Sequence, residues 1–229
     1  MEKLIGEPLF YIFFIYGLSF LLMAYLIIKG ARPASSTPLI MTFYMLALFG
    51  ITHGVTEIVD WIRFIVKTLG VTEIRTLTYV SQIFLVVSFV ILLQFGVNLL
   101  TYRSQNRSAY RAIPLVLVGV YGAIIVALGI TDIIKIGLIG RYCFGFAGAL
   151  LSAIALFVVG KTLKPLGNQK LDRGLTTAAA GFICYAVFGG LIITPIAGIP
   201  IQLFRSACAV TIAFASFAVI DIYQYAESK

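Results

Sequence analysis

The chain has 229 residues, of which 61% are hydrophobic and only 11% are charged. Soluble domains typically have about 45–50% apolar and about 25% charged residues, so this composition excludes a soluble globular protein. The formal net charge of +8 does not indicate nucleic-acid binding, because the basic residues lie in short loops between apolar segments, as the positive-inside bias of membrane proteins requires. The sequence predicts an all-α polytopic membrane protein that forms one domain over residues 1–229 and binds the lipid bilayer but no nucleic acid.

Seven apolar segments are long enough to cross a bilayer, whose hydrocarbon core of about 30 Å needs about 20 apolar residues per helix. The segments are residues 9–28, 39–66, 77–101, 113–131, 138–160, 174–194 and 200–224. The first is interpreted as a retained helix rather than a signal peptide, because no small-x-small cleavage pattern follows it. The sequence therefore predicts a seven-transmembrane-helix bundle.

The distribution of lysine and arginine predicts the orientation of the bundle. Ten of the 17 basic residues fall in the first, third and fifth loops and the C-terminal tail, whereas six fall on the opposite side. The excess of basic residues marks the cytoplasmic side. We therefore expect an outside N-terminus and a cytoplasmic C-terminus, in the inner (cytoplasmic) membrane of the cell.

The second apolar segment contains three polar residues on one helical stripe. His53, Glu57 and Asp60 lie at positions i, i+4 and i+7, and ionisable groups inside a membrane must face protein, water or a ligand. On the predicted topology His53 lies in the outer half of the membrane, about 21 Å from the cytoplasmic edge. Polar residues near the outer ends of the fifth and seventh helices complete a candidate ligand-binding cluster. Its members are His53, Glu57, Asp60, Arg141, Gln202 and Arg205.

The sequence leaves three interpretations of this cluster open. It is a structural network of ion pairs and hydrogen bonds, in which Arg141 and Arg205 neutralise the carboxylates, a ligand-sensing pocket, or a proton or ion pathway. Other polar residues fit common membrane features: Tyr16 and most other tyrosines are predicted near helix ends, as in an aromatic belt. Small residues at Gly145, Ala149 and Ala153, with Gly148 and Ser152 beside them, predict a close helix contact, either within the chain or in a dimer.

Several chemical functions are excluded because the sequence lacks the residues that they need. The last helix has no lysine for a retinal Schiff base, and the chain has one histidine in total, whereas intramembrane zinc hydrolases need about three protein ligands. No metal site and no catalytic constellation is expected, so the protein is not predicted to be an enzyme. A five-coordinate haem on His53 stays open, and the cofactor is unknown.

Three spaced blocks, residues 49–61, 140–156 and 198–210, resemble the seven-helix N-terminal sensor region of some prokaryotic membrane histidine kinases and diguanylate cyclases. That family has recurring His-Gly-x-x-Glu, Arg-Tyr and Pro-x-Gln-x-x-Arg motifs. The matching residues here are His53, Gly54, Glu57, Arg141, Tyr142, Pro200, Gln202 and Arg205.

The resemblance implies a signal receptor that works as a homodimer and passes its signal through the seventh helix to a cytoplasmic output domain or protein. This chain ends at Lys229 without such a domain, so we expect either a truncated sensor segment or a stand-alone relative. The predicted function is a sensor for a small ligand, an ion or a lipid, or for pH through His53. The alternatives are a small ion, proton or solute transporter or channel, and a haem- or quinone-binding electron-transfer protein.

Overall fold

Helices account for nearly all of the computed structural model, which describes residues 6–31, 38–72, 74–102, 104–163 and 169–216. The first half of the chain forms α2 (Pro8–Ala31), α3 (Pro38–Thr68), α4 (Arg75–Leu100), the short α5 (Arg107–Arg111) and α6 (Ile113–Ala127). The second half forms α7 (Ile133–Gly140), the π-helical η2 (Arg141–Phe146), α8 (Ala147–Leu163), α9 (Gln169–Tyr185), the π-helical η4 (Ala186–Leu191) and α10 (Ile201–Ala215).

Within the described ranges, six helices are long and apolar enough to cross a membrane, which confirms a multi-pass helical membrane protein. Six of the seven predicted segments fall on these helices, with shifted ends, and the described part of the seventh forms the shorter α10. The fourth, for example, ends at Ala127 rather than at residue 131, because Gly129 adopts a positive φ of 61° that breaks the helix. Residues 217–224 of the seventh predicted helix lie outside the described residues, so the seventh crossing and the orientation stay predictions.

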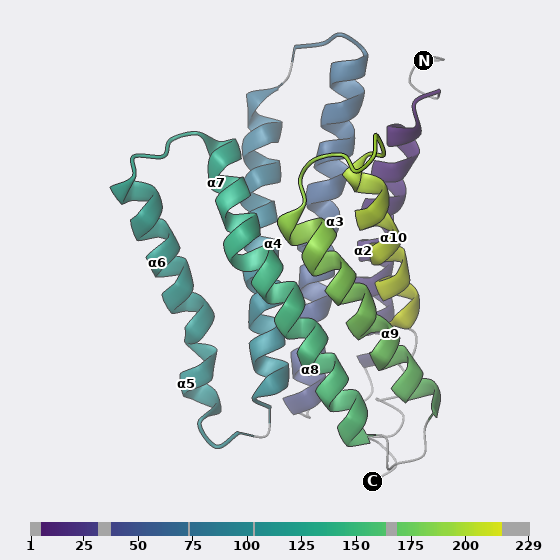
Figure 1. Ribbon diagram of the computed structural model, residues 1–229, viewed down its shortest axis with the longest axis vertical. Coiled ribbons are helices and arrows are strands. Elements are labelled where there is room, and N and C mark those ends of the chain that lie inside the picture. Colours follow the sequence, from purple (N-terminus) through teal and green to yellow (C-terminus); the bar gives the residue numbers. More distant parts are fainter. Residues whose placement is uncertain (1–5, 32–37, 73, 103, 164–168, 217–229) are drawn as a thin grey trace.

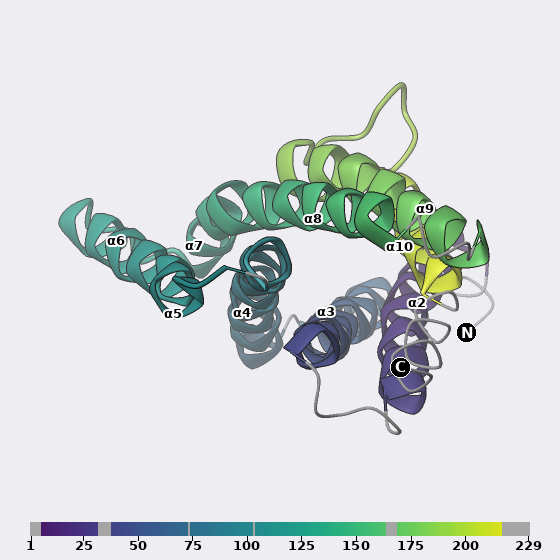
Figure 2. The ribbon, with the colours of Figure 1, turned by 90° about the horizontal axis from the view of Figure 1, so that it is seen from below.

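Six of the helices form two packed layers. α2, α3 and α4 make one layer, and α8, α9 and α10 make the other (Figures 1 and 2). Each helix packs against its chain neighbour, and the layers are joined at both edges because α4 packs on α8 and α10 packs on α2. The result is a closed ring of six helices around a core of aromatic and aliphatic side chains.

α6 lies outside this ring, at the edge next to α4 and α7 (Figure 1). The Tyr121 hydroxyl donates a hydrogen bond to the carbonyl of Ile136 at 2.7 Å and so ties α6 to α7. Most other side chains of α6 are uncovered: Leu115 is 70% exposed and Val126 is 80% exposed. This exposed surface is apolar, as expected of a helix that is long and apolar enough to cross a membrane.

The predicted small-residue contact packs α8 against α4 within the chain. A Cβ atom on Gly148 would lie 2.9 Å from the backbone nitrogen of Leu93, and one on Gly96 would lie 2.9 Å from that of Ser152. The Ser152 hydroxyl also donates to the carbonyl of Leu92 at 3.2 Å. Of the two interpretations that the sequence left open, the structure uses this seam for packing inside one chain.

Candidate functional site

His53 lies at the middle of α3, fifteen residues from Pro38 and fifteen from Thr68, and its side chain is fully buried. The sequence predicts that it lies in the outer half of the membrane, and this depth stays a prediction. Five aromatic rings surround the imidazole, from α2, α3, α4 and α9. The centroid distances are 4.7 Å for Phe20, 5.2 Å for Phe49, 5.2 Å for Phe89, 5.9 Å for Tyr185 and 6.1 Å for Tyr16.

Glycines bring α2 against α3 beside the imidazole. A Cβ atom on Gly50 would lie 2.7 Å from the carbonyl oxygen of Phe20, and one on Gly54 would lie 3.1 Å from that of Gly17. Larger residues would push the two helices apart. Gly54, which follows His53 in the His-Gly-x-x-Glu motif, thus has a packing role that places Tyr16 and Phe20 next to the histidine.

The hydrogen bonds at Nδ1 determine which ring nitrogen of neutral His53 carries the proton. Nδ1 lies 2.8 Å from the Ser88 hydroxyl, which itself donates its proton to the carbonyl of Leu85 at 2.7 Å. Ser88 must therefore accept from His53, since its own proton is used. We assign the neutral tautomer with the proton on Nδ1, which leaves Nε2 as an acceptor.

Nε2 accepts a hydrogen bond from Tyr185, and Tyr185 in turn accepts one from Tyr16 on another helix. The Tyr185 hydroxyl lies 2.6 Å from Nε2 and 3.0 Å from the Tyr16 hydroxyl, which is itself 3.5 Å from Nε2. Because Tyr185 donates to Nε2, its oxygen accepts from Tyr16. The resulting chain of hydrogen bonds runs from Tyr16 through Tyr185 and His53 to Ser88. It connects α2, α9, α3 and α4, and therefore both layers of the bundle.

Glu57 offers Nε2 a second partner on its own helix. Its carboxyl oxygen Oε1 lies 3.5 Å from Nε2, one helical turn away, and the residue is buried. This contact becomes an ion pair only when Nε2 carries a proton, because two acceptors cannot share a hydrogen bond. His53 can therefore bond to α9 through Tyr185 in one protonation state and to Glu57 in another.

Arg141 and Arg205 bind main-chain carbonyls rather than the carboxylates that we expected them to neutralise. Nη1 of Arg141 donates to the carbonyl of Gly189 at 2.5 Å. Arg205, only 8% exposed, donates from Nε to Phe188 at 2.7 Å and from Nη2 to Ile192 at 2.8 Å. These carbonyls lie at the end of η4, where a helix leaves its last carbonyl groups without amide donors and presents the negative end of its dipole. The two arginines thus cap the helix that contains Tyr185.

The two remaining predicted site residues lie apart from this network. Asp60 accepts hydrogen bonds from Nη1 of Arg63 at 2.8 Å and from the Ser81 hydroxyl at 2.7 Å, so it joins α3 to α4. Gln202 is half-buried in the first turn of α10. It takes no part in the hydrogen bonds recorded between described residues around His53. The structure therefore brings His53 and Glu57 together, groups Arg141 with Arg205, and separates Asp60 and Gln202.

Sequence reasoning missed three residues of the network. Tyr16, assigned to an aromatic belt, is 1% exposed in the bundle core, so that expectation is wrong for this tyrosine. Tyr185 and Ser88 received no role. Their position in the sequence could have identified them, because a hydroxyl in the middle of an apolar segment needs a hydrogen-bond partner inside the protein.

Among the described residues, no group of three or more His, Cys, Asp or Glu side chains is close enough together to hold a metal ion. Hydrogen bonds engage both ring nitrogens of His53, and iron ligation at Nε2 would have to displace Tyr185. Comparison of the chain with protein-family models, curated proteins and solved structures gives no match.

Proposed function

We propose that the protein is a membrane-embedded signal sensor in which the hydrogen bonds of His53 are the part that changes state. The supporting observation is the choice of partners at Nε2: Tyr185 on α9 at 2.6 Å, or Glu57 on α3 at 3.5 Å. The first partner joins the two layers of the bundle, and the second does not. A signal that transfers Nε2 from Tyr185 to Glu57 therefore loosens α9 from α3.

The path from this exchange to the rest of the molecule follows the chain. Tyr185 is the last residue of α9, and η4 begins directly after it. Arg205 holds the end of η4 to α10 through the carbonyls of Phe188 and Ile192. A shift of Tyr185 is thus transmitted to α10, the helix through which the resemblance to sensor regions implies output. Such a two-state change needs only a few kcal/mol of differential stabilisation by the signal.

The input is a small ligand, an ion or a lipid that competes for these groups, or a proton on His53. The titratable and charged groups that interact with His53 or with its partners are Tyr16 from α2, Glu57 and Asp60 from α3, Tyr185 from α9, Arg205 from α10 and Arg141 from η2. The arrangement of one imidazole, one carboxyl and two guanidinium groups in an apolar bundle suits a small polar or ionic signal.

The test compares the response of folded variants with that of the wild-type protein. Purified His53→Gln and Glu57→Gln proteins are screened by thermal unfolding at pH 5 to 8 and with sodium, potassium, magnesium, calcium, phosphate and acetate. Asp60→Asn serves as the matched control, because it removes a carboxylate on the same helix outside the network. We expect a condition that shifts the midpoint in the wild type and in the control but not in the two site variants. Equal shifts in all four proteins under every condition would contradict the proposal.

A second candidate, a proton pathway, is favoured by one observation. Tyr16, Tyr185, His53 and Ser88 form a continuous series of groups with exchangeable protons. In liposomes that contain a pH-sensitive dye, a pathway would give proton flux that Tyr185→Phe abolishes. The sensor proposal predicts no flux above that of empty liposomes.

A further inference from the structure

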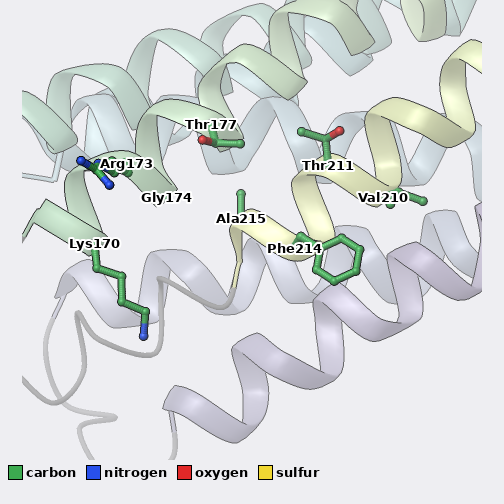
Figure 3. A pocket seen from close by; sticks show the side chains of 8 residues that line it. All are labelled: Lys170, Arg173, Gly174, Thr177, Val210, Thr211, Phe214 and Ala215. Atoms are coloured by element: carbon green, nitrogen blue, oxygen red, sulfur yellow. The ribbon is translucent and has the colours of Figure 1, made fainter.

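A groove runs between α9 and α10, and His53 is not among the residues that line it. Two adjoining hollows of about 510 Å³ and about 320 Å³ share Thr211 as a wall residue. The first is lined by Lys170, Arg173, Gly174, Thr177, Val210, Thr211, Phe214 and Ala215 (Figure 3). The second is lined by Ala180, Gly181, Cys184, Phe188, Phe204, Ala207, Cys208 and Thr211.

One end of the groove is basic. Lys170 and Arg173 both have exposed side chains, and Figure 3 shows them at the side of the hollow opposite Val210. Asp172, which lies between them in the sequence, does not line the groove. Its carboxylate lies on the α8 side, where a Cβ atom on Gly160 would be 3.7 Å from Oδ1. This end therefore suits an anionic group.

The rest of the groove is apolar. Small residues such as Ala180 and Ala207 leave the space open, and the stacked rings of Phe188 and Phe204, with centroids 5.1 Å apart, lie at the far end. The Thr211 hydroxyl is already bonded to the carbonyl of Ala207 at 2.9 Å, so it does not require a polar ligand. A hydrocarbon chain matches this wall.

The length of the groove agrees with that of a lipid in one leaflet. Lys170 and Cys184 are fourteen residues apart on α9, which corresponds to about 21 Å along the helix. One leaflet contributes about 15 Å to the hydrocarbon core. The groove thus has room for a headgroup at Lys170 and Arg173 and for one acyl chain parallel to the helices, which is the direction of lipids in a bilayer.

We propose that this groove binds an anionic phospholipid, with its phosphate at Lys170 and Arg173 and one acyl chain between α9 and α10. The basic end belongs to the side of the bundle that the charge distribution predicts to be cytoplasmic. That leaflet contains the anionic lipids, and basic pockets between helices on this side are suited to their headgroups. Because the groove shares α9 and α10 with the proposed output path, the bound lipid stabilises the packing of these two helices.

The test is a native mass spectrometry titration of the purified full chain with dioleoylphosphatidylglycerol and, separately, with dioleoylphosphatidylcholine. We expect tight binding of one phosphatidylglycerol. Lys170→Gln combined with Arg173→Gln should weaken it about 30-fold, the equivalent of about 1 kcal/mol per basic residue. The matched control combines Arg111→Gln and Lys161→Gln, which removes the same charge from the same end of the bundle, outside the groove.

A second variant tests the acyl chain independently of charge. Ala207 has an exposed side chain in the apolar part of the groove, so Ala207→Phe fills the space without disturbing the core. We expect weaker binding of phosphatidylglycerol and an unchanged melting temperature in lipid-free detergent. The proposal is overturned if phosphatidylcholine binds equally well, if glycerol phosphate alone competes with the lipid, or if the control double variant loses as much affinity as the groove variant.

Discussion

The hydroxyl of Tyr185 lies 2.6 Å from Nε2 of His53, and this contact joins α9 to α3 across the two layers of the bundle. The two residues are 132 positions apart in the sequence, so the contact exists only when the ring of helices is closed. Tyr16 extends it to α2 at 3.0 Å from the Tyr185 hydroxyl. The stability of the closed bundle should therefore depend on these hydroxyl groups.

We expect Tyr185→Phe to lower the free energy of unfolding by about 1 kcal/mol, because it leaves the buried Nε2 atom without a donor. Tyr16→Phe should cost less, since Tyr185 still donates to Nε2 in that variant. The effect of the double variant should be smaller than the two single effects added together, because Tyr16 donates to Tyr185. Equilibrium unfolding in mixed micelles of increasing SDS content measures all three. Tyr142→Phe, at an exposed tyrosine, is the control and should change little; additive effects of Tyr16→Phe and Tyr185→Phe would contradict the proposed order of donors.

The proton of His53 can be located directly, because the chain has a single histidine. In ¹⁵N-histidine-labelled protein in lipid near neutral pH, solid-state NMR should show a protonated Nδ1 and an unprotonated Nε2, since Ser88 uses its own proton on Leu85. Ser88→Ala removes the acceptor of the Nδ1 proton and should shift the Nδ1 signal or populate the other tautomer. A proton on Nε2 in the wild type, or an identical spectrum in Ser88→Ala, would refute the assignment.

The arginine caps at the end of η4 give a third prediction. Arg205→Met leaves the carbonyls of Phe188 and Ile192 without donors and should reduce the free energy of unfolding by about 1–3 kcal/mol. Arg205→Lys should recover part of this loss, because an ammonium group can bind one carbonyl but lacks the planar fork that reaches two. The same SDS unfolding experiment applies. Arg111→Met, at an exposed arginine in α5, controls for the loss of charge, and an equal effect there would exclude a capping role.

The helices themselves were predictable from the sequence, because a bilayer requires long apolar segments and each segment can be recognised from its own residues alone. The pairing of His53 with Glu57 was predictable for a similar reason: residues four apart on a helix lie on the same face. Both inferences use only local sequence.

The partners from other helices were not predictable. Tyr16 and Ser88 reach His53 because α2 and α4 flank α3, and a single sequence does not specify which helices are neighbours. Arg141 and Arg205 were assigned to the carboxylates because charge pairing is the simplest way to satisfy a buried arginine. The carbonyls that they bind instead lie at the end of η4, a π-helical turn of a kind that is rare in proteins.

The close contact between the two π-helical segments gives the last prediction. A Cβ atom on Gly190 in η4 would lie 2.7 Å from the Cα atom of Phe146 in η2, so Gly190→Ala forces two backbones apart. We expect a loss of about 1–3 kcal/mol in the free energy of unfolding, as for other overpacked sites. The same substitution at Gly122 in α6 meets no atom within 4 Å and should be neutral or stabilising by up to about 1 kcal/mol, because alanine favours the helix. The contact between η2 and η4 is proposed to set how closely α9 packs against α8, and therefore where Tyr185 lies. Equal effects of the substitution at Gly190 and at Gly122 would contradict this.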